Sequence, residues 1–152
     1  MATPPDDPRA AQRGVPWRLP SARNVGLVAA GGALGAIARA GLVALVPAGA
    51  GGWPWATLVA NLSGALLLGL LLGVLAESLA GGTWARPLLG TGLLGGYTTF
   101  STLALEIVRL ATAGRVLLAL GYALTSLTCG LLAVWAGGTL AALLVRAARG
   151  TR

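Results

Sequence analysis

One stretch of the chain decides the fold: residues 92–102, which read Gly-Leu-Leu-Gly-Gly-Tyr-Thr-Thr-Phe-Ser-Thr. It lies inside a long apolar segment, yet three glycines followed by four hydroxyl residues around one phenylalanine make a poor helix. We therefore predict a break in the helix at this point. In hydrocarbon, freed backbone groups must bond to protein, ion or water, so the stretch indicates a binding or conduction site. The alternative is a helix that packs closely through its glycines, with its hydroxyls bonded to their own backbone.

The composition is that of an integral membrane protein. Of 152 residues, 56% are hydrophobic and 10% are charged, and the mean hydropathy is +0.80. There is no His and a single Cys, Cys129, which excludes a disulfide framework and a His/Cys metal site. We expect Cys129 to be a small packing residue. All eleven basic residues behind the net charge of +7 are Arg, and they lie mostly in tails and loops, a pattern typical of membrane orientation rather than of nucleic-acid binding.

Four apolar segments are long enough to cross a bilayer, so we expect an all-α membrane protein with four transmembrane helices. The predicted helices cover residues 24–46, 55–75, 87–111 and 116–145, and the third contains the break. The last exceeds the roughly 20 residues that a bilayer needs, so it tilts or projects. Residues 1–22 are predicted to be a disordered tail rather than a signal peptide, residues 23–147 the four-helix unit, and residues 148–152 a second tail.

The arginines are unevenly distributed between the two sides of the predicted bundle. One side carries those of both tails and of the second loop: Arg9, Arg13, Arg18, Arg23, Arg86, Arg146, Arg149 and Arg152. The other side carries Arg109 and Arg115, and Arg39 near the end of the first segment is a further candidate for it. The positive-inside rule therefore predicts that both tails lie in the cytoplasm.

The first two segments hold few polar side chains, and each has two interpretations. Gly31 and Gly35 are four residues apart and share a face, which favours close helix packing. Arg39 is the only charge in residues 25–76; it either snorkels to the interface or attracts an anion at a pore mouth. Asn61 is an amide in an apolar helix, and it either bonds to another helix or offers its two N–H donors to a ligand.

The later segments add hydroxyls and one carboxylate. Tyr122 and Ser126 are four residues apart and share a helix face. Glu106 follows the broken stretch by a turn, where it either bonds to the break or lines a vestibule. The polar groups at membrane depth are mostly donors, which suits an anion better than a cation: Asn61, Thr99, Ser101, Tyr122 and Ser126. Because no nucleotide loop or nucleophile–base pair is visible, we do not expect an enzyme.

Three motifs together resemble the Fluc (CrcB) fluoride channels. They are Gly31-Gly32-x-x-Gly35-Ala36-x-x-Arg39, Thr57-Leu58-x-x-Asn61-x-x-Gly64, and Gly92-x-x-Gly95-Gly96-x-Thr98-Thr99-Phe100-Ser101-Thr102. The resemblance covers all four segments, and the third motif is the specific one. It implies a channel subunit that exports fluoride passively through the cell membrane and lowers fluoride toxicity. It further implies an antiparallel, dual-topology dimer, with a structural sodium ion at its centre held by the carbonyls of Gly95 and Thr98.

The resemblance also implies a fluoride pathway. Its members are Asn61, Phe100, Ser101, Thr102, Thr99, Tyr122, Ser126 and Arg39. Amide and hydroxyl donors offset the dehydration of fluoride, and the ring of Phe100 presents its positive edge to the anion.

The sequence departs from the family pattern in two places. Leu103 stands where the family usually has a second Phe, and Gly130 stands where a polar residue is sometimes found. A missing ring edge, together with the one-sided Arg distribution, favours a heterodimer with a homologous chain over a homodimer. Two other functions stay open: a non-conducting partner subunit, and a small multidrug-type exporter. The exporter would need a carboxylate in the first span, and residues 25–76 contain none.

Overall fold

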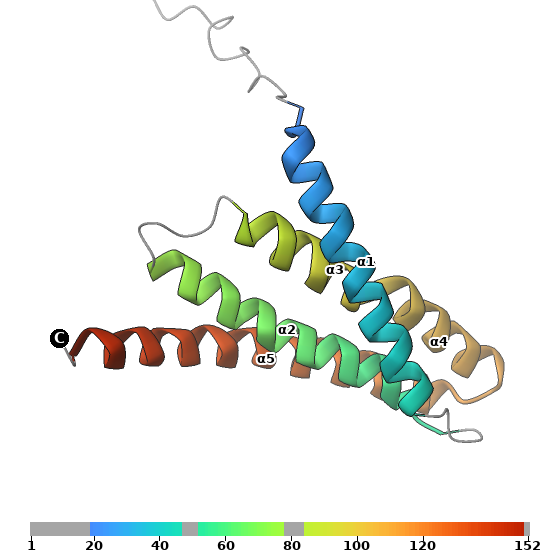
Figure 1. The fold of residues 1–152 in the computed structure, drawn as a ribbon. Coiled ribbons are helices and arrows are strands. Elements are labelled where there is room, and N and C mark those ends of the chain that lie inside the picture. The colour runs from blue at the N-terminus through green and yellow to red at the C-terminus, as the bar shows by residue number, and fades with distance from the viewer. Residues whose placement is uncertain (1–18, 47–51, 78–83, 151–152) are drawn as a thin grey trace, which may run out of the picture.

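The computed structural model describes residues 19–46, 52–77 and 84–150, and in these residues every regular element is helical. The elements are α1 (Ala22–Leu45), α2 (Trp55–Glu77), η1 (Arg86–Leu94), α3 (Gly95–Tyr97), α4 (Phe100–Thr112) and α5 (Val116–Gly150). In Figure 1, α2 and α5 lie side by side, and α1 crosses the stretch formed by η1 and α3. Most of the predicted N-terminal tail, residues 1–18, lies outside the described residues.

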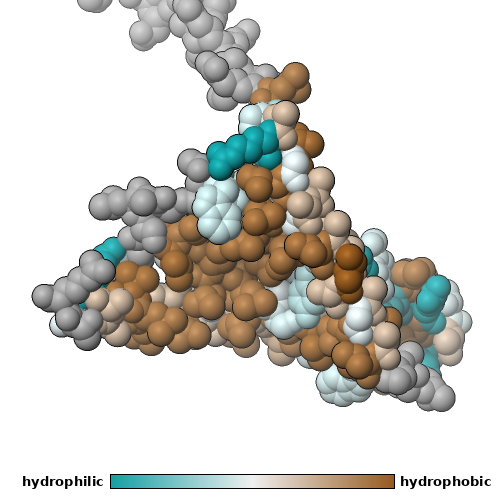
Figure 2. All heavy atoms as spheres, viewed as in Figure 1, coloured by the Kyte–Doolittle hydropathy of each residue, from teal (hydrophilic) through white to brown (hydrophobic). Residues whose placement is uncertain are grey.

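Three helices of the described chain are long and apolar enough to cross a membrane, which confirms three of the predicted spans. They are Ala22–Leu45, Trp55–Ala76 and Val116–Gly150. Their large apolar side chains point outward: Leu34 is 57% exposed and Leu117 is 87% exposed. Figure 2 shows the hydrophobic colour over much of the visible face. A helix that is apolar on its outward side as well as its inward side requires lipid around it, so the chain is a membrane protein.

The predicted helix limits agree closely with the observed ones, except at the C-terminus. There α5 continues past the expected end at Val145 to Gly150. Residues 148–150, which we assigned to the C-terminal tail, are therefore helical. Ala and Arg are both strong helix formers, which accounts for the extension.

Small residues bring the helices into contact. A Cβ on Gly31 of α1 would overlap the carbonyl oxygen of Leu88 in η1, and a Cβ on Gly137 of α5 would overlap that of Leu66 in α2. The predicted packing role of Gly31 is thereby confirmed, whereas the sequence analysis did not identify Gly137. Such backbone contacts are typical of helix association in membranes, where van der Waals packing replaces the hydrophobic effect. The only large side chain that is fully buried among the described residues is Tyr122.

The third segment begins as a π-helix, η1, which the sequence analysis did not predict. At its end the N–H of Gly95 donates to the carbonyls of Gly90 and Gly92. A π-helix of this length is unusual, because most π stretches are a single turn. We attribute it to Gly90 and Gly92, which have weak helix preference, and to the contact of Gly92 with α1, where a Cβ would lie 3.0 Å from the Cα of Gly31.

Candidate ion pathway

The third segment is interrupted at Thr98 and Thr99, inside the stretch where the break was predicted. Thr98 has φ −82° and ψ 158°, and Thr99 has φ −150° and ψ 119°, so both are extended. Thr99 is the N-cap of α4: its Oγ1 accepts from the N–H of Thr102 at 3.2 Å. The same hydroxyl donates to Thr102 Oγ1 at 3.0 Å. The hydroxyl residues of the stretch therefore restart the helix after the break.

Asn61 of α2, a neighbouring helix, forms hydrogen bonds with the backbone of the break. Its Nδ2 donates to the carbonyl of Thr99 at 3.0 Å, and its Oδ1 accepts from the N–H of Thr99 at 2.8 Å. The interhelical hydrogen bond considered for Asn61 is thus confirmed. An Asn amide has two N–H donors, so one of them stays available for a further ligand.

These bonds release two backbone carbonyls at the break. In a continuous helix the carbonyl of Gly95 would accept from the N–H of Thr99, and the carbonyl of Thr98 would accept from the N–H of Thr102. Here the N–H of Thr99 bonds to Asn61, and the N–H of Thr102 bonds to the hydroxyl of Thr99. Gly95 and Thr98, the two residues expected to hold a cation, therefore lose their helical N–H partners.

Two cavities lie against the break and share part of their lining. The first, of about 360 Å³, is lined by Asn61, Gly95, Thr98, Thr99 and Phe100, among others. The second, of about 410 Å³, is lined by Asn61, Phe100, Leu103, Ser126 and Gly130, among others. The Phe100 side chain is 81% exposed, and both departures from the family pattern, Leu103 and Gly130, lie in the cavity walls.

Ser126 of α5 lines the second cavity. Its Oγ is buried, and within the described residues it has no hydrogen-bond partner. The cavities therefore bring together an amide N–H from Asn61, a hydroxyl from Ser126 and the ring of Phe100. These three side chains come from α2, α5 and α4, respectively.

The carboxylate of Glu106 links three helices beside the cavities. Its Oε1 accepts from Thr57 Oγ1 at 2.8 Å, and its Oε2 accepts from Tyr122 OH at 2.7 Å. The ring of Tyr122 packs edge-on against Trp53, with the ring centroids 5.6 Å apart. From the sequence alone, Glu106 was expected either to bond to the break or to line a vestibule. Its two partners lie 49 and 16 residues away, so no local pattern could identify them.

The other predicted pathway residues lie around these cavities rather than in their walls. The hydroxyl of Tyr122 donates a hydrogen bond to Glu106, and the hydroxyl oxygen of Thr102 accepts one from Thr99. The Oγ of Ser101 is 3.3 Å from Thr99 Oγ1, and Ser101 is exposed. Arg39 reaches the break from the opposite side, where its Nε donates to the carbonyl of Gly96 at 3.2 Å.

A membrane helix that is broken beside a cavity lined by residues of the break and by polar side chains of neighbouring helices is characteristic of ion channels and transporters. Residues 26–138 match the family model of the CrcB-like proteins, described as camphor resistance (CrcB). The chain belongs to the CrcB family, whose members are channels and not enzymes.

Curated relatives match the chain along most of its length. The "Fluoride-specific ion channel FluC 1" of Mycobacterium bovis is 47% identical over 127 residues, which cover 84% of this chain and 93% of the relative. The "Fluoride-specific ion channel FluC" of Thermus thermophilus is 47% identical over 120 residues, covering 78% and 95%. The protein of the same name from Paracoccus denitrificans is 46% identical over 112 residues, covering 74% and 89%.

Proposed function

We propose that this chain is a subunit of a fluoride-selective channel through which fluoride leaves the cytoplasm passively. The observation that carries the proposal is the meeting of Asn61, Phe100 and Ser126 at the cavities beside a broken helix. The names of the relatives support fluoride as the ion. Liposomes containing the chain, with a partner chain if one is required, should release fluoride and retain chloride.

The chemistry of the cavities suits a small, strongly hydrated anion. Fluoride must lose part of its water in a narrow path, and only close donors offset that loss. Asn61 has an N–H to spare, and Ser126 lines the second cavity with a buried hydroxyl. Phe100 can add its positively polarised ring edge. A larger anion would lie farther from the same donors, so each hydrogen bond to it would contribute less binding energy.

The pathway is completed, in this proposal, by a second chain that lies antiparallel to the first. The third segment then acts as the fourth membrane crossing, with its break near mid-depth. Both cavities are open, and Gly95 and Phe100 are exposed in the single subunit. An aromatic and a bare backbone at membrane depth need cover, because lipid cannot satisfy a freed carbonyl.

A structural sodium ion fits the carbonyls of Gly95 and Thr98. Both residues line the first cavity, and unwound backbone carbonyls are the ligands that membrane proteins use for sodium. When bound, the ion would supply a fixed positive charge beside the fluoride path. The chain's own part is to keep these carbonyls free of helical bonds, which Asn61 and Thr99 do.

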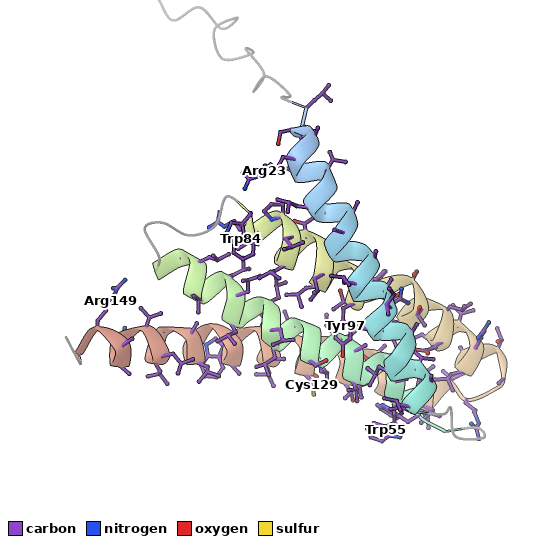
Figure 3. All side chains as sticks on the ribbon, in the orientation of Figure 1. Arg23, Trp55, Trp84, Tyr97, Cys129 and Arg149 are labelled. Atoms are coloured by element: carbon purple, nitrogen blue, oxygen red, sulfur yellow. The ribbon has the colours of Figure 1, made fainter. Side chains whose placement is uncertain are left out.

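The proposed location is the plasma membrane, with both tails in the cytoplasm. Arg23 at the start of α1 and Arg149 near the end of α5 belong to the Arg-rich side (Figure 3). An inside-negative potential drives an anion outward, by about 2.3 kcal/mol per charge at 100 mV. Because neutral HF crosses lipid and dissociates inside, such a path would lower fluoride toxicity.

A non-conducting partner subunit is the second candidate. Leu103 lines both cavities, so a branched aliphatic side chain replaces a ring edge at the point where an anion would pass. The multidrug-type exporter is disfavoured, because α1 contains no carboxylate and Glu106 is already bonded to Thr57 and Tyr122.

A further inference from the structure

We infer that Arg39 is a positioning residue that helps select which backbone carbonyls of the break are left for the cation. The inference rests on the proposed sodium site. It differs from the two roles considered for Arg39 on the sequence alone, snorkelling and anion attraction, because it assigns the guanidinium a backbone partner.

The starting observation is a long-range hydrogen bond. The Nε of Arg39, on α1, donates to the carbonyl of Gly96 at 3.2 Å, and the bond is partly buried. Gly96 packs directly on α1, since a Cβ there would overlap the carbonyl oxygen of Gly32. Gly96 is absent from the lining of both cavities, although its neighbour Gly95 lines the first. The Arg39 bond therefore engages a carbonyl on the α1 side of the break.

Leaving Tyr97 aside, five carbonyls around the break fall into two groups. Those of Leu94, Gly96 and Thr99 each receive a donor: Leu94 from the N–H and hydroxyl of Thr98, Gly96 from Arg39, and Thr99 from Asn61. Those of Gly95 and Thr98 lose their helical donors and belong to residues that line the first cavity. Arg39 and Asn61 thus hold the break from two sides.

Arginine suits this position better than lysine would. The Nε–H lies within a rigid planar fork, which fixes its direction toward Gly96, whereas a lysine ammonium is a hydrated point charge on a flexible stem. Without the directed donor, the Gly96 carbonyl would be free to turn, and the peptide planes of Gly95 and Gly96 share an α-carbon. The spacing of the carbonyls left for the cation would then be less well defined.

The experiment compares Arg39→Lys and Arg39→Met with the wild-type chain, purified with its partner if one is required. The thermal unfolding midpoint is measured as sodium replaces a large organic cation, and fluoride efflux is measured over the same sodium range. Arg39→Lys keeps the charge and loses the directed Nε–H, and Arg39→Met loses both. Arg109→Met, a change at an exposed arginine of α4, is the matched control.

Wild type and Arg109→Met should be stabilised by sodium with the same midpoint, and both Arg39 variants should need roughly tenfold more sodium. If sodium stabilises the wild type and both Arg39 variants equally, the positioning role is wrong while the sodium site stands. If only Arg39→Met loses efflux, and only at low ionic strength, Arg39 is an anion attractor and the inference is overturned. A wild type indifferent to sodium removes the sodium site itself, and the inference with it.

Discussion

The side-chain amide of Asn61 makes a closed pair of hydrogen bonds with the backbone of Thr99, donating at 3.0 Å and accepting at 2.8 Å. Asn61 thereby accepts the hydrogen bond that the N–H of Thr99 would donate to the carbonyl of Gly95 in an unbroken helix. Because the same side chain lines both cavities, the structure of the break and the walls of the cavities depend on each other.

Replacing Asn61 by Asp should abolish fluoride efflux and also lower stability. An Asp carboxylate can still accept from the N–H of Thr99, but it cannot donate to the Thr99 carbonyl. It also places a negative charge on the proposed path, and repulsion at about 4 Å is of order 4 kcal/mol at an effective dielectric of 20. Efflux from liposomes and the thermal unfolding midpoint measure the two effects separately.

Asn24→Asp is the control for this substitution. It makes the same chemical change in the first turn of α1, where a negative charge is favourable. We expect normal efflux from it. Near-normal efflux from Asn61→Asp would show that Asn61 is not on the fluoride path.

Gly31→Ala should destabilise the subunit, whereas Gly41→Ala should not. A Cβ on Gly31 would overlap the backbone of η1, which cannot move without separating it from α1. Overpacking of this kind costs about 1–3 kcal/mol. Gly41 lies on the same helix with open space around it, and Ala there gains up to about 1 kcal/mol of helix propensity. Equal unfolding midpoints for the two variants would contradict the observed packing of α1.

Tyr122→Phe should weaken the link between α4 and α5. The ring and its edge-on contact with Trp53 remain, but Glu106 Oε2 loses its donor. A hydrogen bond to a charged group contributes about 1.5–3 kcal/mol. A double-mutant cycle with Thr57→Val, which removes the donor to Oε1, should show coupling between the two positions. Strictly additive losses in unfolding free energy would mean that Glu106 does not join them.

The sequence predicted the helices well because their main determinant is local. The starts of α2 and α5 at Trp55 and Val116 coincide with the predicted limits, and the break falls within residues 92–102. A run of apolar residues and a cluster of glycine and threonine are both readable without knowledge of the neighbours. The packing of Gly31 was predictable for the same reason, since the spacing of Gly31 and Gly35 lies within one helix.

What the sequence could not supply is the identity of partners distant in the chain. The bond from Asn61 to Thr99 spans 38 residues, and the bond from Arg39 to Gly96 spans 57. Periodicity within one helix identifies the face on which such a residue lies but not its partner. We attribute the π-helical form of η1 likewise to its contact with α1.

Leu103→Phe tests whether the missing second aromatic limits conduction. Leu103 lines both cavities, and a Phe ring there would add a polarised edge beside Phe100. If the chain needs an unlike partner to supply that edge, Leu103→Phe should raise the efflux of the chain expressed alone. Full efflux from the unaltered chain alone, unchanged by Leu103→Phe, would contradict the preference for a heterodimer.

The most direct test of the central claim is the paired efflux of fluoride and chloride from liposomes. Vesicles loaded with both ions, with and without the protein and its partner, are given a potassium conductance to balance charge, and both ions are followed with selective electrodes. The account predicts rapid loss of fluoride, retention of chloride, and no fluoride loss in vesicles that carry Asn61→Asp. Equal release of the two anions, or fluoride release at the rate of protein-free vesicles, would contradict it.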